Sequence, residues 1–151
     1  MRATAYAAGR RKDGTTVIHH GVGVQPPTVG PGGFVALGKE SVVRVRYRME
    51  RAARLICFLS CQRTKGGFAG NFLLDHPAAN TPPDAAGWRT ATFPVPAARA
   101  VVAEKYPTPI DTELRTLIIQ TFDQDVGLEV AEVEIAPRTD LEQKALRDLP
   151  R

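Results

Sequence analysis

Four residues in the middle of the chain have the side chains that a sugar site requires. Phe68 and Tyr106 offer aromatic rings against which a pyranose ring can stack, and Arg63 and Asn71 offer planar polar groups that bracket hydroxyls. The segments around them are rich in glycine and proline, which favours loops. These residues are therefore the predicted ligand-binding set. Trp88 is a further aromatic candidate, but a single Trp that opens a strand after glycine is more often part of a core.

Residues arranged for catalysis are hard to find in the sequence. Ser41 and Ser60 have no G-x-S-x-G motif around them, and neither Cys57 nor Cys61 has a credible base partner. The glycines of "VGPGGF" precede neither a helix nor a Lys-Ser/Thr pair, so they predict a turn and no phosphate site. The sequence therefore favours a protein that is not an enzyme.

The histidines and cysteines argue against a metal site and against a disulfide. His19 and His20 are adjacent, so on a strand their side chains point to opposite faces, and His76 is distant in sequence. On an extended strand Cys57 and Cys61 are roughly 13 Å apart. A disulfide needs Cα atoms within about 7 Å, so we expect two reduced, buried thiols. Cysteine usage leaves the cellular compartment undecided.

Charge is distributed unevenly along the chain, whose net charge is +4. Residues 1–65 contain 12 Lys/Arg against 3 Asp/Glu, and residues 66–151 contain 8 against 13. The asymmetry fits either a surface for an acidic partner or basic and acidic strands that lie side by side, and we favour the second interpretation. The residues expected to pair across such neighbouring strands are three basic and two acidic side chains: Arg44, Arg46, Arg48, Glu129 and Glu134. Nothing resembles a nucleic-acid-binding module, so no nucleic-acid partner is expected.

Composition predicts one all-β domain. The 151 residues are 43% hydrophobic, and the 12 prolines and 13 glycines separate short apolar runs. No apolar run reaches the roughly 18 residues of a membrane span, and the first residues lack the apolar core of a signal peptide, so no direct membrane insertion is expected. We expect a disordered segment over 1–15, a β-sandwich over 16–137, and a helix or linker over 138–151.

Alternating patterns locate the main strands. "VVRVRYRM" places Val43, Val45, Tyr47 and Met49 on one face and the arginines on the other. In "RLICFLSCQ" both faces are apolar, which indicates a strand that is covered on both sides or central in its sheet. Further strands are expected near residues 16–24, 71–74, 88–93, 114–122 and 127–135.

One helix is expected at the end of the chain. Thr139 and Glu142 form a capping box at the start of "TDLEQKALRDLP", and Pro150 ends the pattern. This helix is an appendage or the start of a linker, and it could contact a protein partner.

The last strand contains a break in its alternation. Leu128 and Val130 share one face, whereas Val133 and Ile135 have the opposite phase. A β-bulge at Ala131 and Glu132 reconciles the two halves, because the side chains beyond a bulge change face. All four apolar side chains then face one core. With this strand the chain has about eight, enough for two packed antiparallel sheets.

The segments "VVRVRYRME", "AGWRTATFPVP" and "GLEVAEVEI" resemble strands of the galactose-binding-like jelly rolls that include many carbohydrate-binding modules. A similar series occurs in some FecR-like bacterial regulators. The resemblance spans about residues 33–136 and rests on core patterns.

The resemblance implies a jelly-roll β-sandwich of two antiparallel sheets that binds a polysaccharide or oligosaccharide without catalysis. It also implies a structural calcium ion, for which "DQD" supplies Asp123 and Asp125. An extracytoplasmic location, as part of a longer chain, would follow. The alternative is a structural or protein-interaction domain of an exported regulator or sensor that has no sugar site.

Overall fold

A computed structural model of the chain describes residues 4–10, 16–24, 34–121 and 126–137, and describes side chains from residue 21 onward. The predicted helix over 139–149 and the carboxylates of Asp123 and Asp125 lie outside these residues. Among the described residues, no helix is long and apolar enough to cross a membrane.

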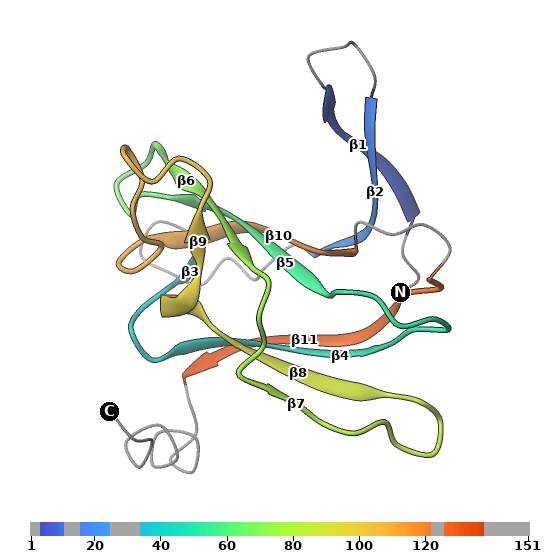
Figure 1. The fold of residues 1–151 in the computed structure, drawn as a ribbon. Coiled ribbons are helices and arrows are strands. Elements are labelled where there is room, and N and C mark those ends of the chain that lie inside the picture. Colours follow the sequence, from blue (N-terminus) through green and yellow to red (C-terminus); the bar gives the residue numbers. More distant parts are fainter. Residues whose placement is uncertain (1–3, 11–15, 25–33, 122–125, 138–151) are drawn as a thin grey trace.

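The described chain is built from strands that form two antiparallel sheets (Figure 1). The larger sheet has the order β1-β2-β10-β5-β6-β9, and β3 also pairs with β10. Its strands are β1 (Thr4–Arg10), β2 (Thr16–Val24), β3 (Val35–Ala36), β5 (Ile56–Gln62), β6 (Phe68–Leu74), β9 (Arg99–Ala100) and β10 (Glu113–Thr121). β5 lies between β10 and β6, which confirms the prediction that this two-sided apolar strand is central.

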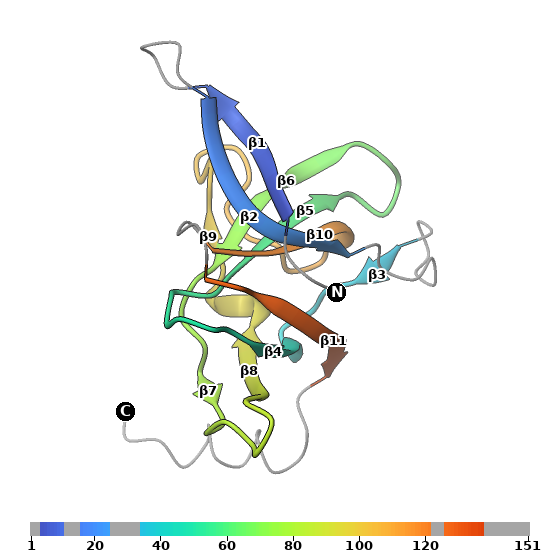
Figure 2. The same cartoon turned by 90° about the vertical axis from the view of Figure 1, so that its right-hand side faces the viewer.

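The smaller sheet has the order β11-β4-β8-β7 and packs against the larger one. Its strands are β4 (Ser41–Arg48), β7 (Ala79–Asn80), β8 (Arg89–Pro94) and β11 (Glu129–Pro137), and a 3-10 turn, η1 (Val95–Ala97), follows β8. Figures 1 and 2 show the two sheets as separate layers, with the β1–β2 hairpin projecting beyond them. The predicted all-β architecture of two antiparallel sheets is confirmed.

One core joins the two sheets, because side chains from both belong to the same buried cluster. The larger sheet contributes alternate residues such as Leu59, Phe72 and Leu117, all of which are fully buried. The smaller sheet contributes Val45 and Phe93, which are equally buried. Alternation with a period of two thus directs one face of each strand into the sandwich.

The first strand is a departure from the sequence-based expectation. Residues Thr4–Arg10 form β1 and pair with β2, where a disordered segment over 1–15 was expected. The segment "TAYAAGR" lacks the apolar alternation that marks a half-buried strand. The strand is paired along its length with β2, a partner that a local pattern cannot reveal.

The predicted bulge in β11 is confirmed. Val130 pairs with Tyr47 and Glu132 pairs with Arg46, so Ala131 is the extra residue. Val130 is fully buried, and Val133 and Ile135 beyond the bulge pack against the same core. The bulge therefore keeps both halves of the strand facing inward.

The predicted pairing of a basic with an acidic strand is also confirmed. β4 and β11 are neighbours, and Arg48 Nη2 lies 3.0 Å from Glu129 Oε2 while Arg44 Nη1 lies 3.3 Å from Glu134 Oε1. The uneven charge along the sequence is thus partly neutralised across one strand pair.

Candidate functional site

The outer face of the larger sheet combines an aromatic ring with neutral polar groups. Phe58 on β5 pairs with Leu73 on β6 and with Ile118 on β10. Its neighbours Cys57 and Leu59 belong to the core, so Phe58 projects away from the smaller sheet. The next outward row is polar. We call the six half-buried side chains of these two rows the outer face: Phe58, Ser60, Asn71, Leu73, Thr116 and Ile118.

At the start of β6 two predicted site residues come together. The rings of Phe68 and Tyr106 lie edge to face, with centroids 5.0 Å apart and planes at 80°. Phe68 is 49% exposed, whereas Tyr106 is half-buried and packs against the core. This arrangement, which we call the aromatic pair, presents a ring to solvent on an anchored support.

Gly70 allows Tyr106 to approach β6 closely. Its φ of 114° is a conformation that other residues rarely adopt, and a Cβ at this position would lie 2.5 Å from Cβ of Tyr106. Glycine is therefore required here for the loop that carries Tyr106 to pack on the strand.

Backbone hydrogen bonds hold that loop against β6. Val101 N donates to Asn71 O over 3.0 Å, and Tyr106 N donates to Val102 O over 2.9 Å. Val101 and Val102 are 54% and 51% exposed, and Nζ of Lys105 lies 5.8 Å from the centroid of the Tyr106 ring. The loop thus adds aliphatic surface and a cation beside the aromatic pair.

Of the four predicted ligand-binding residues, the structure brings only Phe68 and Tyr106 into contact within the described chain. Asn71 belongs to the outer face, next along β6, and its carbonyl anchors the loop. Arg63 is exposed in the turn between β5 and β6, where its N donates to Gly67 O over 2.8 Å.

A cluster of charged residues lies beyond the other end of β6. Nη2 of Arg99 lies 3.1 Å from Oδ2 of Asp75, and Nη2 of Arg54 lies 3.7 Å from the same atom. Arg54 also donates through Nε to Asp75 O over 3.3 Å and contacts Nε2 of His76 at 2.8 Å. Burial raises the pKa of Asp75, but the hydrogen bond from Arg99 and the nearby positive charges outweigh it, so the pKa is lowered. We call Arg54, Asp75, His76 and Arg99 the Asp75 cluster.

Trp88 is not a core residue, contrary to the interpretation favoured from sequence. It is half-buried directly before β8, and the guanidinium carbons of Arg46 and Arg48 lie 5.5 and 4.5 Å from its ring centroid. Asp84 accepts the Trp88 N–H over 2.9 Å, and this bond is the largest influence that lowers the pKa of Asp84. From Arg44 to Arg48, every second residue of β4 is an arginine on the outward side of the smaller sheet, and two of these arginines stack on the indole. The Trp88 ring is therefore held by cation–π contacts on the surface and not by burial in the core.

The two cysteines are free and buried, as predicted. Burial raises the pKa of both thiols, to about 11 for Cys61, where a hydrogen bond with Thr112 opposes the shift. Such thiols are poor nucleophiles. No group of three His, Cys, Asp or Glu side chains in the described ranges is placed to hold a metal ion.

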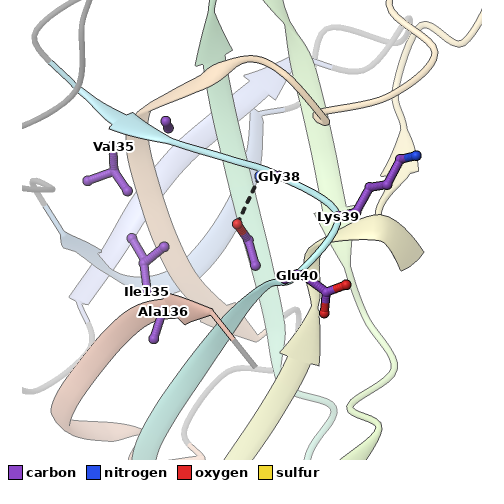
Figure 3. Close-up of a pocket in the computed structure, with 8 residues that line it drawn as sticks. Val35, Gly38, Lys39, Glu40, Ile135 and Ala136 are labelled. Atoms are coloured by element: carbon purple, nitrogen blue, oxygen red, sulfur yellow. Dashed lines mark hydrogen bonds between the residues drawn. The ribbon is translucent and has the colours of Figure 1, made fainter. Parts of the chain in front are cut away.

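A groove of about 360 Å³ opens between the β3–β4 turn and β11. Val35 and Ile135 form its aliphatic walls, and Gly38 N donates to Oγ of Ser41 over 2.9 Å. Figure 3 shows the side chains of Lys39 and Glu40 directed away from these walls. The groove has the size of a small-molecule site, but the described residues place no convergent set of polar side chains between its walls.

Sequence reasoning missed Phe58, Arg54 and Arg99. Phe58 belongs to "RLICFLSCQ", in which both faces of the strand are apolar. That pattern could have indicated that Phe58 lies on the outer face of a central strand. Arg54 and Arg99 meet only because β5, β6 and β9 are neighbours. No local signal in the sequence indicates that meeting.

No protein-family model matches the chain, and no curated protein or solved structure matches it either.

Proposed function

We propose that this chain is a non-catalytic binding module of the jelly-roll type whose ligand is a carbohydrate. The observation that carries the proposal is the aromatic pair, in which Phe68 is half exposed and Tyr106 supports it edge to face. The apolar face of a pyranose ring stacks on an aromatic ring, and such a ring needs support to keep its orientation. Tyr106, packed on Gly70, provides that support.

The length of the polar and aromatic surface favours an oligosaccharide over a single sugar. Phe68 and Asn71 are three residues apart on β6, a separation of about 10 Å at roughly 3.3 Å per residue. From Asn71 the outer face continues across β5 to Phe58, Ser60 and Thr116. Hydroxyl and amide side chains beside an aromatic ring are the groups that hydrogen-bond sugar hydroxyls.

The test is a glycan-array screen followed by titration of the strongest hit. We expect Phe68→Ala to weaken binding by at least tenfold and to leave the melting temperature nearly unchanged, because the ring is half exposed. The screen is run with calcium and with a chelator, because the resemblance to jelly-roll modules implies an ion. A screen without any glycan hit would contradict the proposal.

Val102→Ala is the matched control for Phe68→Ala. Val102 is 51% exposed in the loop whose turn carries Tyr106, but it has no ring on which a sugar can stack. We expect this variant to retain glycan binding. An equal loss in both variants would show that exposed apolar area, and not stacking, drives binding.

The second candidate function is a protein-interaction domain, such as that of an exported regulator. The exposure of Val101 and Val102 beside Phe68 favours it, because contiguous exposed apolar side chains mark protein interfaces. This alternative predicts that Val102→Ala weakens capture of the partner and that no glycan binds.

A further inference from the structure

The Asp75 cluster contains more positive than negative charge. One carboxylate, Asp75, is approached by the guanidinium groups of both Arg54 and Arg99. His76 lies beside both Arg54 and Asp75, with its Nε2 2.8 Å from Nη2 of Arg54 and 3.8 Å from Oδ1 of Asp75. Two guanidinium groups against one carboxylate leave one positive charge in excess. A second anion would balance it.

The arginines retain donors for such an anion. Their contacts within the described chain use Nη2 of Arg99 and Nε and Nη2 of Arg54. The Nη1 groups of both residues therefore have no acceptor among the described residues. Arg54 is also anchored, because its Nε donates to the backbone carbonyl of Asp75. An anchored guanidinium loses less side-chain entropy when it binds a ligand.

The cluster adjoins the outer face directly. Arg99 on β9 pairs with Leu73 on β6, and Leu73 pairs with Phe58 on β5. Asp75 follows the end of β6, and Arg54 lies two residues before Ile56 at the start of β5. Phe58, Leu73 and Arg99 therefore form one row across the sheet, with an aromatic ring at one end and a guanidinium group at the other. A ligand on Phe58 is within reach of Arg99.

We propose that the ligand is an acidic oligosaccharide whose carboxylate or sulfate group is bound by Arg54 and Arg99. The inference rests on the proposed carbohydrate function and names the class of sugar. Arginine donates paired N–H groups to the oxygens of such anions, and these charge-assisted bonds are stronger than neutral ones. Asp75 positions both arginines and restricts the site to a ligand that supplies further negative charge.

The experiment compares two double variants of the full chain. Arg54→Gln/Arg99→Gln removes the two guanidinium groups of the cluster. Arg44→Gln/Arg46→Gln removes the same charge from the opposite surface of the sandwich, where these residues pair with Glu134 and Asp84. The probes are a hexuronate oligosaccharide, a sulfated galactan oligosaccharide and a neutral oligosaccharide of matched length, each titrated by calorimetry. Melting temperatures verify that both variants are folded.

We expect wild type and the Arg44/Arg46 variant to prefer at least one acidic probe over the neutral one. The Arg54/Arg99 variant should bind that acidic probe at least tenfold more weakly and bind the neutral probe unchanged. Added salt should weaken acidic binding in wild type.

Three outcomes would overturn the inference: no preference for an acidic probe in wild type, unchanged acidic binding in the Arg54/Arg99 variant, or an equal loss in the control variant. Binding of the neutral probe that depends on Phe68 would leave the proposed function intact in all three cases. Absence of binding to every probe and to the array would instead contradict the proposed function itself.

Discussion

Trp88 owes its position to its neighbours on β4. The guanidinium groups of Arg46 and Arg48 lie over its ring, and Asp84 holds its backbone through a 2.9 Å hydrogen bond. A stacked arginine contributes about 0.5 to 1 kcal/mol at an exposed site. The indole therefore stabilises a surface network, in contrast to Phe93, which is fully buried between the sheets.

We expect Trp88→Ala to lower the free energy of unfolding by about 1 to 2 kcal/mol, the sum of two stacking contacts. Phe93→Ala should cost about 3 to 5 kcal/mol, because it leaves a cavity in the core. Urea unfolding of both variants measures the difference. Equal losses would mean that the indole is packed as a core residue is.

At the scale of the element, the bulge of β11 decides which side chains reach the core. The strand has β4 on one side and lies at the edge of the smaller sheet. Its extra residue, Ala131, separates two inward-facing halves, and a bulge of this kind also discourages pairing with another chain at an edge.

Deletion of Ala131 should convert β11 into a regular strand, because removal of the extra residue brings Leu128, Val130, Val133 and Ile135 into one phase. Val133 and Ile135 then keep facing the core, and Glu132 and Glu134 keep facing outward, so no carboxylate becomes buried. We expect the deletion variant to stay folded with only a small fall in melting temperature, as measured by thermal unfolding.

Glu134→Ala provides the comparison for that deletion. Its carboxylate pairs with Arg44 on the surface and its side chain is 52% exposed, so the variant should lose less than about 1 kcal/mol. An unfolded deletion variant beside a stable Glu134→Ala variant would contradict this prediction and show that β11 requires the bulge itself.

At the scale of the whole molecule, ion pairs connect segments that are distant in sequence. Asp75 contacts Arg54 and Arg99, and Asp84 contacts Arg46 at 3.4 Å. The pKa of both carboxyl groups is lowered in the folded chain. A lowered folded-state pKa makes folding more favourable wherever the carboxylate is ionised.

This linkage predicts how stability depends on pH. The contribution is fully present above the unfolded-state pKa of about 3.9 and is lost as the pH falls through the lower folded-state values. The melting temperature should therefore fall below about pH 4, and Asp75→Asn/Asp84→Asn should show a smaller fall over the same range. An identical fall in the variant would assign the acid sensitivity to other carboxyl groups.

The sequence alone determined the local features, because they depend on side-chain alternation over a few residues. The period of two along a strand predicts the inward and outward faces of β4 and the bulge at Ala131. The distance between Cys57 and Cys61 along one strand predicts that both thiols are reduced. The pairing of basic β4 with acidic β11 followed from charge, which acts between neighbouring strands.

The tertiary structure alone decided which distant residues meet. Phe58 became a surface ring because β5 pairs with β10 and β6, and its outer side is not covered by the second sheet. Arg54 and Arg99 converge on Asp75 although 45 positions separate them in the numbering. Trp88 lies outside the core because its ring stacks with the guanidinium groups of Arg46 and Arg48 on β4. Such meetings depend on the order of strands in a sheet, and strand order is set by the packing of the whole chain, which no local pattern encodes.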